Sequence, residues 1–262
     1  MSHTKVKCFA RSIAGFLFLF LVAAATAQGV PPNLLQAMQW RLIGPHRGGR
    51  ITSVSGVPSQ PAIYYIGTPG GGVWKTENGG QVWNPIFEQE RVASIGALVV
   101  APSDPRVVYV GTGEQTQGNG VYKSIDAGLT WTNIGLRETH VITGIVVDPR
   151  NADIVLVAAA GDHWSGAERG IYKTTDGGKN WQKVLYQDGE TGVADVEADP
   201  DNPSVVYTAV WTRPEDPFST DEPEKKKKQD GAIYKSTDEG STWNPVEGDR
   251  VKRFMDLVRR LR

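Results

Sequence analysis

An eight-residue motif recurs four times in this chain and constrains its fold more than any other feature. The four copies read TENGGQVW (76–83), SIDAGLTW (124–131), TTDGGKNW (174–181) and STDEGSTW (236–243). Each copy combines a small hydroxyl residue, a central Asp or Asn, a glycine and a closing tryptophan. A fixed motif that returns about every 50 residues is typical of a repeat architecture, in which one supersecondary unit is copied along the chain.

Each motif belongs to a longer unit of four short segments. In the second unit these are IGALVVAP, VVYVGTG, NGVYKSI and a segment that begins at Trp131. The segments are rich in Val, Ile and Tyr and are bounded by Gly, Pro, Asn or Asp, as strands and turns are. Four strands per unit predict an all-β fold, a partial β-propeller with about four blades of four antiparallel strands. The expected propeller region is 51–247, with blades at 51–87, 95–136, 142–186 and 193–247.

The motif resembles the Asp-box, or BNR repeat, of sialidases, xyloglucanases and sortilin-like receptors. SIDAGLTW and STDEGSTW match the pattern fully, whereas the other two copies depart from it at Asn78, Val82 and Asn180. Stretches such as VYVGTGE and RGIYKTTDGGKNW are similar to those of large secreted bacterial propellers described as glycosyl-hydrolase-like or sortilin-like. The resemblance implies a propeller fold, and it specifies function far less than fold.

The Asp-box residues are expected to stabilise turns. The motif falls at the hairpin between the third and fourth strands, where a short Asp or Asn side chain can accept hydrogen bonds from unpaired backbone N–H groups. The glycines would supply backbone freedom, and the closing tryptophans would pack between blades. The predicted structural residues are Asn78, Asp126, Asp176, Asp238, Trp83, Trp131, Trp181 and Trp243.

Candidate functional residues lie in loops at the opposite end of the blades, which precede each first strand or join the second strand to the third. The resemblance implies that these loops carry the active site in the enzymes. A glycoside hydrolase needs two carboxyl groups about 5–10 Å apart, and Glu114 and Asp162 are the catalytic candidates. The candidate ligand-binding residues are Arg47, Arg50, His140, His163, Trp164 and Glu190, and His46 and Arg169 lie in the same loops.

The sequence leaves open whether the chain is an enzyme. It is similar to xyloglucanases around GTPGGGVW, but Pro69 stands where that resemblance implies a catalytic Asp. The sialidase comparison offers Arg50 for an Arg–Ile–Pro motif, with Thr52 in place of the proline and no further arginines of the site identified. No close metal-ligand spacing, dinucleotide loop or Ser–His–Asp arrangement is found, so neither a metal nor a cofactor is expected.

Residues 1–27 are predicted to be a secretory signal peptide. Basic residues precede the apolar run IAGFLFLFLVAAA, and ATA (25–27) fits a cleavage site before Gln28. The run is shorter than the roughly 20 residues that a spanning helix needs, so no membrane span is expected after cleavage. The only cysteine, Cys8, lies in this segment, which leaves the exported chain without a disulfide. The expected location is periplasmic or extracellular.

The flanks of the propeller region differ from the blades. Residues 28–50 form a lead-in, and residues 248–262 form an atypical basic tail with Val251, Phe254, Val258 and Leu261 at helical spacing. Two interpretations of the tail stay open, a partner-binding amphipathic helix and a truncated or frame-shifted reading frame. An open array of blades leaves a bare face at each end, which favours self-association.

The sequence therefore favours an exported scaffold that binds a glycan or an extracellular peptide or protein at these loops. One alternative is a glycoside hydrolase whose catalytic carboxylates lie partly in further blades, and another is an extracytoplasmic assembly factor. The chain carries 28 basic and 29 acidic residues, for a net charge of −1. This balance argues against a nucleic-acid partner.

Overall fold

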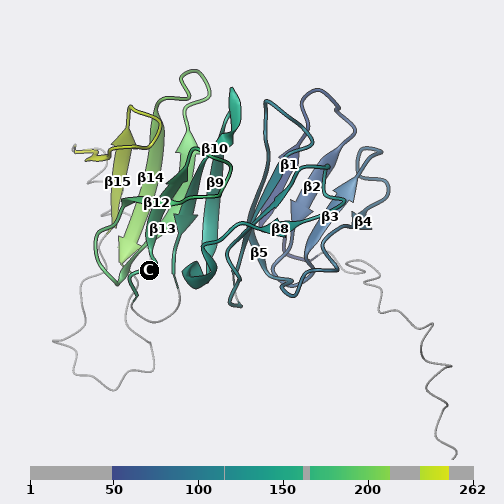
Figure 1. Cartoon of the computed structure of the whole chain (residues 1–262), viewed down its shortest axis with the longest axis horizontal. Helices are drawn as coiled ribbons and strands as arrows, with labels where there is room; N and C mark the ends of the chain where they lie inside the picture. The colour runs from purple at the N-terminus through teal and green to yellow at the C-terminus, as the bar shows by residue number, and fades with distance from the viewer. Residues whose placement is uncertain (1–48, 115, 162–165, 213–230, 248–262) are drawn as a thin grey trace, which may run out of the picture. The chain divides into compact units, whose positions relative to one another are not determined.

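The repeated units form four antiparallel sheets of four strands, and within each sheet the strands pair in chain order (Figure 1). The computed structural model describes residues 49–114, 116–161, 166–212 and 231–247. Sheet 1 contains β1 (Ser53–Gly56), β2 (Tyr64–Gly67), β3 (Val73–Thr76) and β4 (Asn84–Pro85). Sheet 2 contains β5 (Ile95–Val100), β6 (Val108–Thr112), β7 (Val121–Ser124) and β8 (Thr132–Asn133).

The third and fourth repeats are built alike. Sheet 3 contains β9 (Ile142–Asp148), β10 (Asn151–Ala159), β11 (Gly170–Thr174) and β12 (Gln182–Leu185). Sheet 4 contains β13 (Thr191–Ala198), β14 (Val206–Thr212), β15 (Gly231–Ser236) and β16 (Asn244–Pro245). One 3-10 turn, η1 (Arg137–Thr139), precedes β9. The expectation of an all-β fold with four-stranded antiparallel blades is confirmed.

Several expected features fall beyond this part of the chain. The signal peptide (1–27), all but the last two residues of the lead-in (28–50) and the basic tail (248–262) lie outside the described residues. Among the described residues, no helix is long and apolar enough to cross a membrane.

The strands in the middle of the array are buried over most of their length because both of their faces are covered. All five residues of β6 are buried, and so are the last five of β10. In β13, by contrast, buried residues such as Val193 and Val196 are interspersed with exposed ones such as Asp195 and Glu197. A strand that packs on one side only shows this change of polarity between its two faces.

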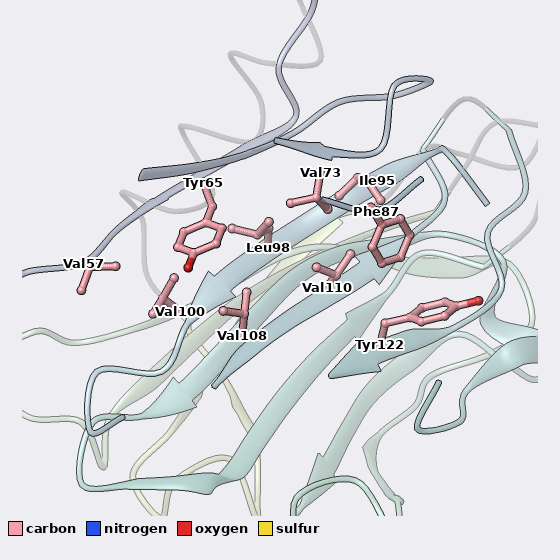
Figure 2. Close-up of a cluster of buried hydrophobic side chains, with 10 residues drawn as sticks. All are labelled: Val57, Tyr65, Val73, Phe87, Ile95, Leu98, Val100, Val108, Val110 and Tyr122. Carbon is pink, nitrogen blue, oxygen red and sulfur yellow. The ribbon is translucent and has the colours of Figure 1, made fainter. Parts of the chain in front are cut away.

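A cluster of buried side chains joins sheet 1 to sheet 2 (Figure 2). Tyr65 and Val73 of sheet 1 lie with Leu98, Val108 and Val110 of sheet 2 in this cluster, and all are nearly inaccessible to solvent. Burial of apolar surface of this kind contributes about 25 cal/mol per Å². Apolar contact therefore holds one sheet to the next, since no hydrogen-bonded ladder joins the two sheets.

The same arrangement continues along the chain. A second cluster contains Tyr109 of sheet 2 and Val155 of sheet 3, and a third contains Leu156 of sheet 3 and Val206 of sheet 4. Among the described strands, extensive contacts between sheets join only consecutive sheets. The described sheets therefore contact one another in chain order, and each interface between consecutive sheets consists of a similar apolar cluster.

The meander divides the connections of every sheet between two ends. The turn between strands one and two and the Asp-box hairpin between strands three and four lie at one end, which we call the box end. The loop between strands two and three, and the segment that leads into strand one, lie at the other end, which we call the loop end. This division follows from antiparallel pairing in chain order.

Candidate functional site

At the box end, the carboxylate of Asp126 organises its own hairpin. Its Oδ1 accepts hydrogen bonds from the Ser124 hydroxyl (2.7 Å) and the Thr130 backbone N–H (2.8 Å), and its Oδ2 accepts one from the Thr130 hydroxyl (2.6 Å). The Ser124 hydroxyl in turn accepts the Gly128 N–H at 2.8 Å. These hydrogen bonds, led by that from the Thr130 side chain, lower the pKa of Asp126 to about 2.

The third and fourth copies use the same geometry with one change of donor. Asp176 Oδ2 accepts from the Asn180 side-chain amide at 2.7 Å, so this asparagine replaces the usual threonine hydroxyl as donor. The hydrogen bonds from Asn180 lower the pKa of Asp176 to about 2. Asp238 accepts from the Thr242 hydroxyl and backbone N–H, and its pKa is lowered for the same reason.

The first copy changes two residues together. Asn78 Oδ1 accepts from the Thr76 hydroxyl (2.9 Å) and the Val82 N–H (2.8 Å), as the aspartates do. The second side-chain atom of Asn78 is an N–H2 donor, which cannot accept a hydrogen bond. Val82 has no hydroxyl to donate, so the two departures from the Asp-box pattern compensate one another.

Each Asp-box hairpin is also tied to the first turn of its own sheet. The residue after the central Asp or Asn donates its backbone N–H, at 2.8–3.0 Å in all four sheets, to a carbonyl in the turn between strands one and two or, in sheet 3, near the start of strand two. This residue has a positive φ, 59–73°, which favours glycine, and two copies accept a larger side chain there. The four donor–acceptor pairs are Gly79–Ala62, Ala127–Arg106, Gly177–Asp153 and Glu239–Ser204.

The closing tryptophans of two boxes bridge neighbouring sheets. Trp131 Nε1 donates to the Ile86 carbonyl of sheet 1 at 2.7 Å, and Trp181 Nε1 donates to the Ile134 carbonyl of sheet 2 at 2.8 Å. Trp243 instead donates to Gly240 in its own hairpin. All the polar groups named so far at the box end are therefore directed into turns or between sheets.

At the loop end, the structure brings together two of the candidate residues. The Arg50 guanidinium, just before β1, donates to the Glu114 carboxylate in the loop after β6. Both side chains are accessible to solvent, so the pair itself adds little to stability. It places a fork of N–H donors beside carboxylate acceptors where sheets 1 and 2 meet, a combination able to bind hydroxyl or carboxylate groups.

The backbone that carries Glu114 is held from two sides. The Glu114 N–H donates to the hydroxyl of the buried Ser94 at 3.0 Å. On the other side, the Gly118 N–H donates to the His140 carbonyl of the segment before β9 at 2.6 Å. A Cβ atom on Gly113 would lie 1.8 Å from that carbonyl oxygen, so only glycine fits there. Hydrogen bonds from two other segments therefore hold the described part of this loop.

His140 itself has an unusual backbone. Its φ of 56° and ψ of −45° accompany a hydrogen bond from the Val141 N–H to the Thr139 carbonyl, which makes a three-residue turn. Such a γ-turn with positive φ is strained for a residue with a side chain. The strain is tolerated where the His140 carbonyl meets the loop that carries Glu114.

The loop that contains Pro69 offers no ionisable side chain. Residues 67–72 read GTPGGG, and the loop closes on itself through hydrogen bonds from the Thr68 hydroxyl to the Gly72 carbonyl (3.1 Å) and from the Gly71 N–H to the Thr68 hydroxyl (2.9 Å). The Pro69 loop of sheet 1 therefore adds only backbone groups and small side chains to the site that Arg50 and Glu114 form.

The remaining candidates are placed as follows. Arg169 is buried and donates to the Ala160 carbonyl, while Glu190 and His140 are half-buried at the loop end. In the described part of the chain, no three His, Cys, Asp or Glu side chains gather as they would around a metal ion. The candidates that lie outside the described residues are His46, Arg47, Asp162, His163 and Trp164.

Sequence reasoning missed some of the residues that build these contacts. Ser94 was not singled out, because a single buried serine before a strand has no recognisable pattern. A repeated lysine in strand three could have been noticed in VWKT, VYKS, IYKT and IYKS. Lys123 pairs with Asp153 of the next sheet at 2.9 Å, and Lys173 donates to the Glu239 carbonyl at 2.8 Å.

A family model matches most of the chain. The model described as sortilin-Vps10 (sortilin, neurotensin receptor 3) matches residues 71–185 and 119–256. Curated relatives are xyloglucanases. A probable oligoxyloglucan-reducing end-specific xyloglucanase of Neosartorya fischeri is 29% identical in an alignment of 199 positions, which covers 73% of this chain and 20% of the relative. Xyloglucanase Xgh74A of Acetivibrio thermocellus is 24% identical in an alignment of 273 positions, which covers 93% of this chain and 32% of the relative.

Solved structures agree on the fold. An ancestral GH74 enzyme superposes with a TM-score of 0.59 at 23% identity, covering 81% of this chain and 26% of that structure. The GH74 xyloglucanase from Xanthomonas campestris gives a TM-score of 0.55 at 22% identity, covering 77% and 31%. The chain spans about a fifth to a third of the length of the curated relatives described here. Its fold is that of a glycoside-hydrolase-like propeller.

Proposed function

This chain belongs to the sortilin-Vps10 family, and on that premise we propose that it binds a glycan at its loop end without cleaving it. The observation that carries the proposal is the Arg50–Glu114 pair where sheets 1 and 2 meet. Guanidinium and carboxylate groups side by side can donate to and accept from neighbouring sugar hydroxyls. The loop that carries Glu114 is held by hydrogen bonds to Ser94 and His140, which lowers the cost of ordering its backbone on binding.

The ligand class is proposed from the relatives. The curated relatives described above are named for xyloglucan, so a xyloglucan oligosaccharide is the first ligand to test. Binding without turnover is favoured by Pro69, which stands where the resemblance to xyloglucanases implies a carboxylate. Proline has no side-chain proton to transfer, and glycoside hydrolysis generally needs two carboxyl groups across the bond.

The test compares binding and cleavage in the same samples. Calorimetric titration with a xyloglucan heptasaccharide should show saturable binding, and a reducing-end assay should show no new ends. Glu114→Gln and Arg50→Gln should each weaken binding about tenfold, the loss expected for a charge-assisted hydrogen bond. Arg106→Gln is the matched control, because Arg106 pairs with Asp104 at the box end. Equal affinity in all variants would contradict the proposed site.

A glycoside hydrolase is the second candidate, and the names of the relatives favour it. In that case new reducing ends appear, and Glu114→Gln or Asp162→Asn abolishes them with binding retained. The distance between the two carboxyl groups would then set the stereochemical course. Cleavage that survives both substitutions would exclude these two residues as the catalytic pair.

We also propose that the protein is exported, with residues 1–27 removed, residues 28–50 as a lead-in and residues 51–247 as the propeller region. The apolar run after three basic residues supports this division. N-terminal sequencing of the protein recovered outside the cytoplasm should begin at Gln28. An N-terminus at Met1 on the recovered protein would contradict signal cleavage.

A further inference from the structure

In three of the four sheets, the second strand carries a tyrosine opposite the lysine of the third strand. These cross-strand pairs are Tyr65–Lys75, Tyr109–Lys123 and Tyr207–Lys235. In each pair the lysine Nζ lies 5.3–5.6 Å from the centre of the tyrosine ring. Sheet 3 has Leu156 at this place, opposite Lys173. Sheet 3 therefore keeps the lysine of the pair without the phenol ring.

The tyrosine fills the space between one sheet and the next near the box end. Tyr65 of sheet 1 is 1% exposed, and its hydroxyl donates to the Ala127 carbonyl of sheet 2 at 3.1 Å. Tyr109 of sheet 2 is 0% exposed, and its hydroxyl donates to the Ala152 carbonyl of sheet 3 at 2.9 Å. In both interfaces the ring is buried and a backbone carbonyl satisfies its polar end.

Between sheets 3 and 4 a groove lies at the box end, and we call it the sheet 3–4 groove. It encloses about 290 Å³ of space, part of which is continuous with bulk solvent. None of the described residues that line it is aromatic. A space of this size suits a single side chain better than a large ligand. The lining includes Asp148, Glu239 and the apolar residues Leu156, Ala198, Pro203 and Val206.

The lining of this groove corresponds to residues that surround a tyrosine in the preceding interface. Val206 of sheet 4 and Val155 of sheet 3 hold equivalent places, each opposite the first residue of an Asp-box. Pro203 and Ala152 precede these two valines by three residues. Val155 and Ala152 belong to the buried cluster that contains Tyr109. The sheet 3–4 groove therefore keeps the apolar lining of a tyrosine site, while the ring itself is replaced by a smaller leucine.

The polar groups that accompany the ring in the other interfaces are also present. Lys173 Nζ donates to the Glu239 carbonyl at 2.8 Å and to the Ser241 hydroxyl at 2.9 Å. Glu239 follows the central Asp of its box, as Ala127 does in the second box, and the Ala127 carbonyl accepts the Tyr65 hydroxyl. A phenol ring in the groove would thus have an ammonium group near its face and a carbonyl near its hydroxyl.

The rim of the groove is acidic. Arg150 donates to the carboxylates of both Asp148 and Glu239, so one cation serves two anions. Asp199 and Asp201 lie in the turn between β13 and β14, which forms one side of the groove. A basic residue is the charge complement of such a rim.

We propose that the sheet 3–4 groove binds a tyrosine side chain of a partner polypeptide, one that carries a basic residue beside this tyrosine. The partner ring takes the place that Tyr65 and Tyr109 take in their own interfaces. The groove lies at the box end, whereas Arg50 and Glu114 meet at the loop end. The proposal therefore goes beyond glycan binding and does not depend on it. A free phenol shares the ring but not the charge, and the experiment separates the two.

Titration of the whole chain followed by nuclear magnetic resonance tests the proposal. The blocked tripeptide lysine–tyrosine–lysine should bind saturably and shift the methyl signals of Leu156 and Val206. Lysine–alanine–lysine should bind at least about tenfold more weakly, because the ring supplies most of the buried apolar area. Glutamate–tyrosine–glutamate and p-cresol should each bind several-fold more weakly, because neither offers a cation to the rim. Equal affinity of any of these three probes, or no shift at Leu156, would overturn the proposal.

Substitutions that fill the groove give an independent check. Leu156→Tyr supplies the ring that the other sheets have, and Ala198→Leu enlarges a side chain on the sheet 4 side. Each should weaken binding of lysine–tyrosine–lysine at least about tenfold, because the space for the partner ring is lost. Ala62→Leu is the matched control, since Ala62 is exposed at the box end of sheet 1, and it should bind as the natural chain does.

A thermal melt of each variant verifies that it is folded. Undiminished binding by a folded Leu156→Tyr or Ala198→Leu variant would overturn the proposal, and so would an equal loss of binding in Ala62→Leu. The two groove variants act from different sheets, so one remains informative if the other does not fold.

Discussion

At the scale of single residues, the Asp-box turns show a matching of donors to acceptors. Asp126 offers two acceptor oxygens, and Thr130 supplies a hydroxyl and an N–H. Asn78 offers one acceptor, and Val82 supplies only an N–H. Because a turn with unmatched polar atoms loses hydrogen bonds, the change to asparagine at position 78 is accompanied by a change to valine four residues later.

A double-mutant cycle measures this coupling in the second box. Asp126→Asn or Thr130→Val alone should lower the free energy of unfolding by about 0.5–1 kcal/mol, the usual contribution of one hydrogen bond. The double variant, which copies the first box, should be destabilised by less than the sum of the single changes. Urea unfolding of the natural chain and of the three variants supplies the changes in the free energy of unfolding. Strict additivity would show that the two residues are independent.

The depressed pKa values predict how stability depends on pH. Asp126 titrates near pH 2 in the folded chain instead of 3.8, so its charged form favours the fold. This contribution is complete above about pH 4 and disappears as the pH falls through 2. The melting temperature should therefore fall from pH 4 to pH 2, and it should fall less in Asp126→Asn with Asp176→Asn. If the melting temperature falls equally in both proteins between pH 4 and pH 2, the lowered pKa values of these aspartates do not stabilise the fold.

At the scale of the elements, the closing tryptophan bonds to the preceding sheet only where the last strand of that sheet pairs without a register shift. Trp131 and Trp181 reach carbonyls of the sheet before them. β12 contains a register shift opposite Ile171 and Tyr172, and the following tryptophan, Trp243, bonds within its own hairpin. A bulge changes the direction of the backbone groups of its strand, which accounts for the missing tryptophan hydrogen bond between sheets 3 and 4.

Tryptophan substitutions test this difference. Trp131→Phe removes the hydrogen bond to Ile86 and part of the packing against Phe87, whose ring centre lies 5.2 Å away. The free energy of unfolding should fall by about 1–2 kcal/mol. Trp243→Phe should have less than half that effect, because its N–H has a partner only in the local turn. Equal losses in denaturant titrations would show that the link between sheets adds nothing.

At the scale of the whole molecule, the described sheets form a chain of nearest neighbours. Sheets 2 and 3 have a described neighbour on both sides, and sheets 1 and 4 on one side. In such an array, stability is approximately a sum of unit and interface contributions. The middle strands, with both faces buried, should be the last to open.

Hydrogen exchange can reveal this order. Backbone amides of β6 and β10 should exchange at least roughly tenfold more slowly than those of β2 and β14, because each end sheet shares only one apolar interface with another described sheet. Mass spectrometry of peptic fragments resolves the four strands. Uniform protection across all four would show that the sheets unfold as one cooperative unit.

The sequence predicted the fold well because its information is local and repeated. Each Asp-box turn is closed by hydrogen bonds between residues two to four positions apart, such as Ser124, Asp126 and Thr130. The strands between these turns are short and rich in β-branched residues. Four copies of one local pattern leave little freedom in which strands pair, and the four-stranded meander follows.

The candidate site could be predicted only in part. The sequence indicated that Arg50 and Glu114 lie in loops at one end, because antiparallel pairing assigns each loop to an end. It contained nothing that paired these two residues, which are 64 positions apart and meet only because sheet 1 stacks on sheet 2. The strained turn at His140 was equally hidden, since no local motif encodes it.

The sequence by itself therefore determined the turns, the strands and their pairing within each sheet, because these depend on contacts between near neighbours in the chain. Only the tertiary structure decided which loop residues meet, which tryptophans join sheets and where a groove lies between sheets 3 and 4. These features depend on how one twisted sheet packs against the next, and that packing is set by side chains distributed over both sheets.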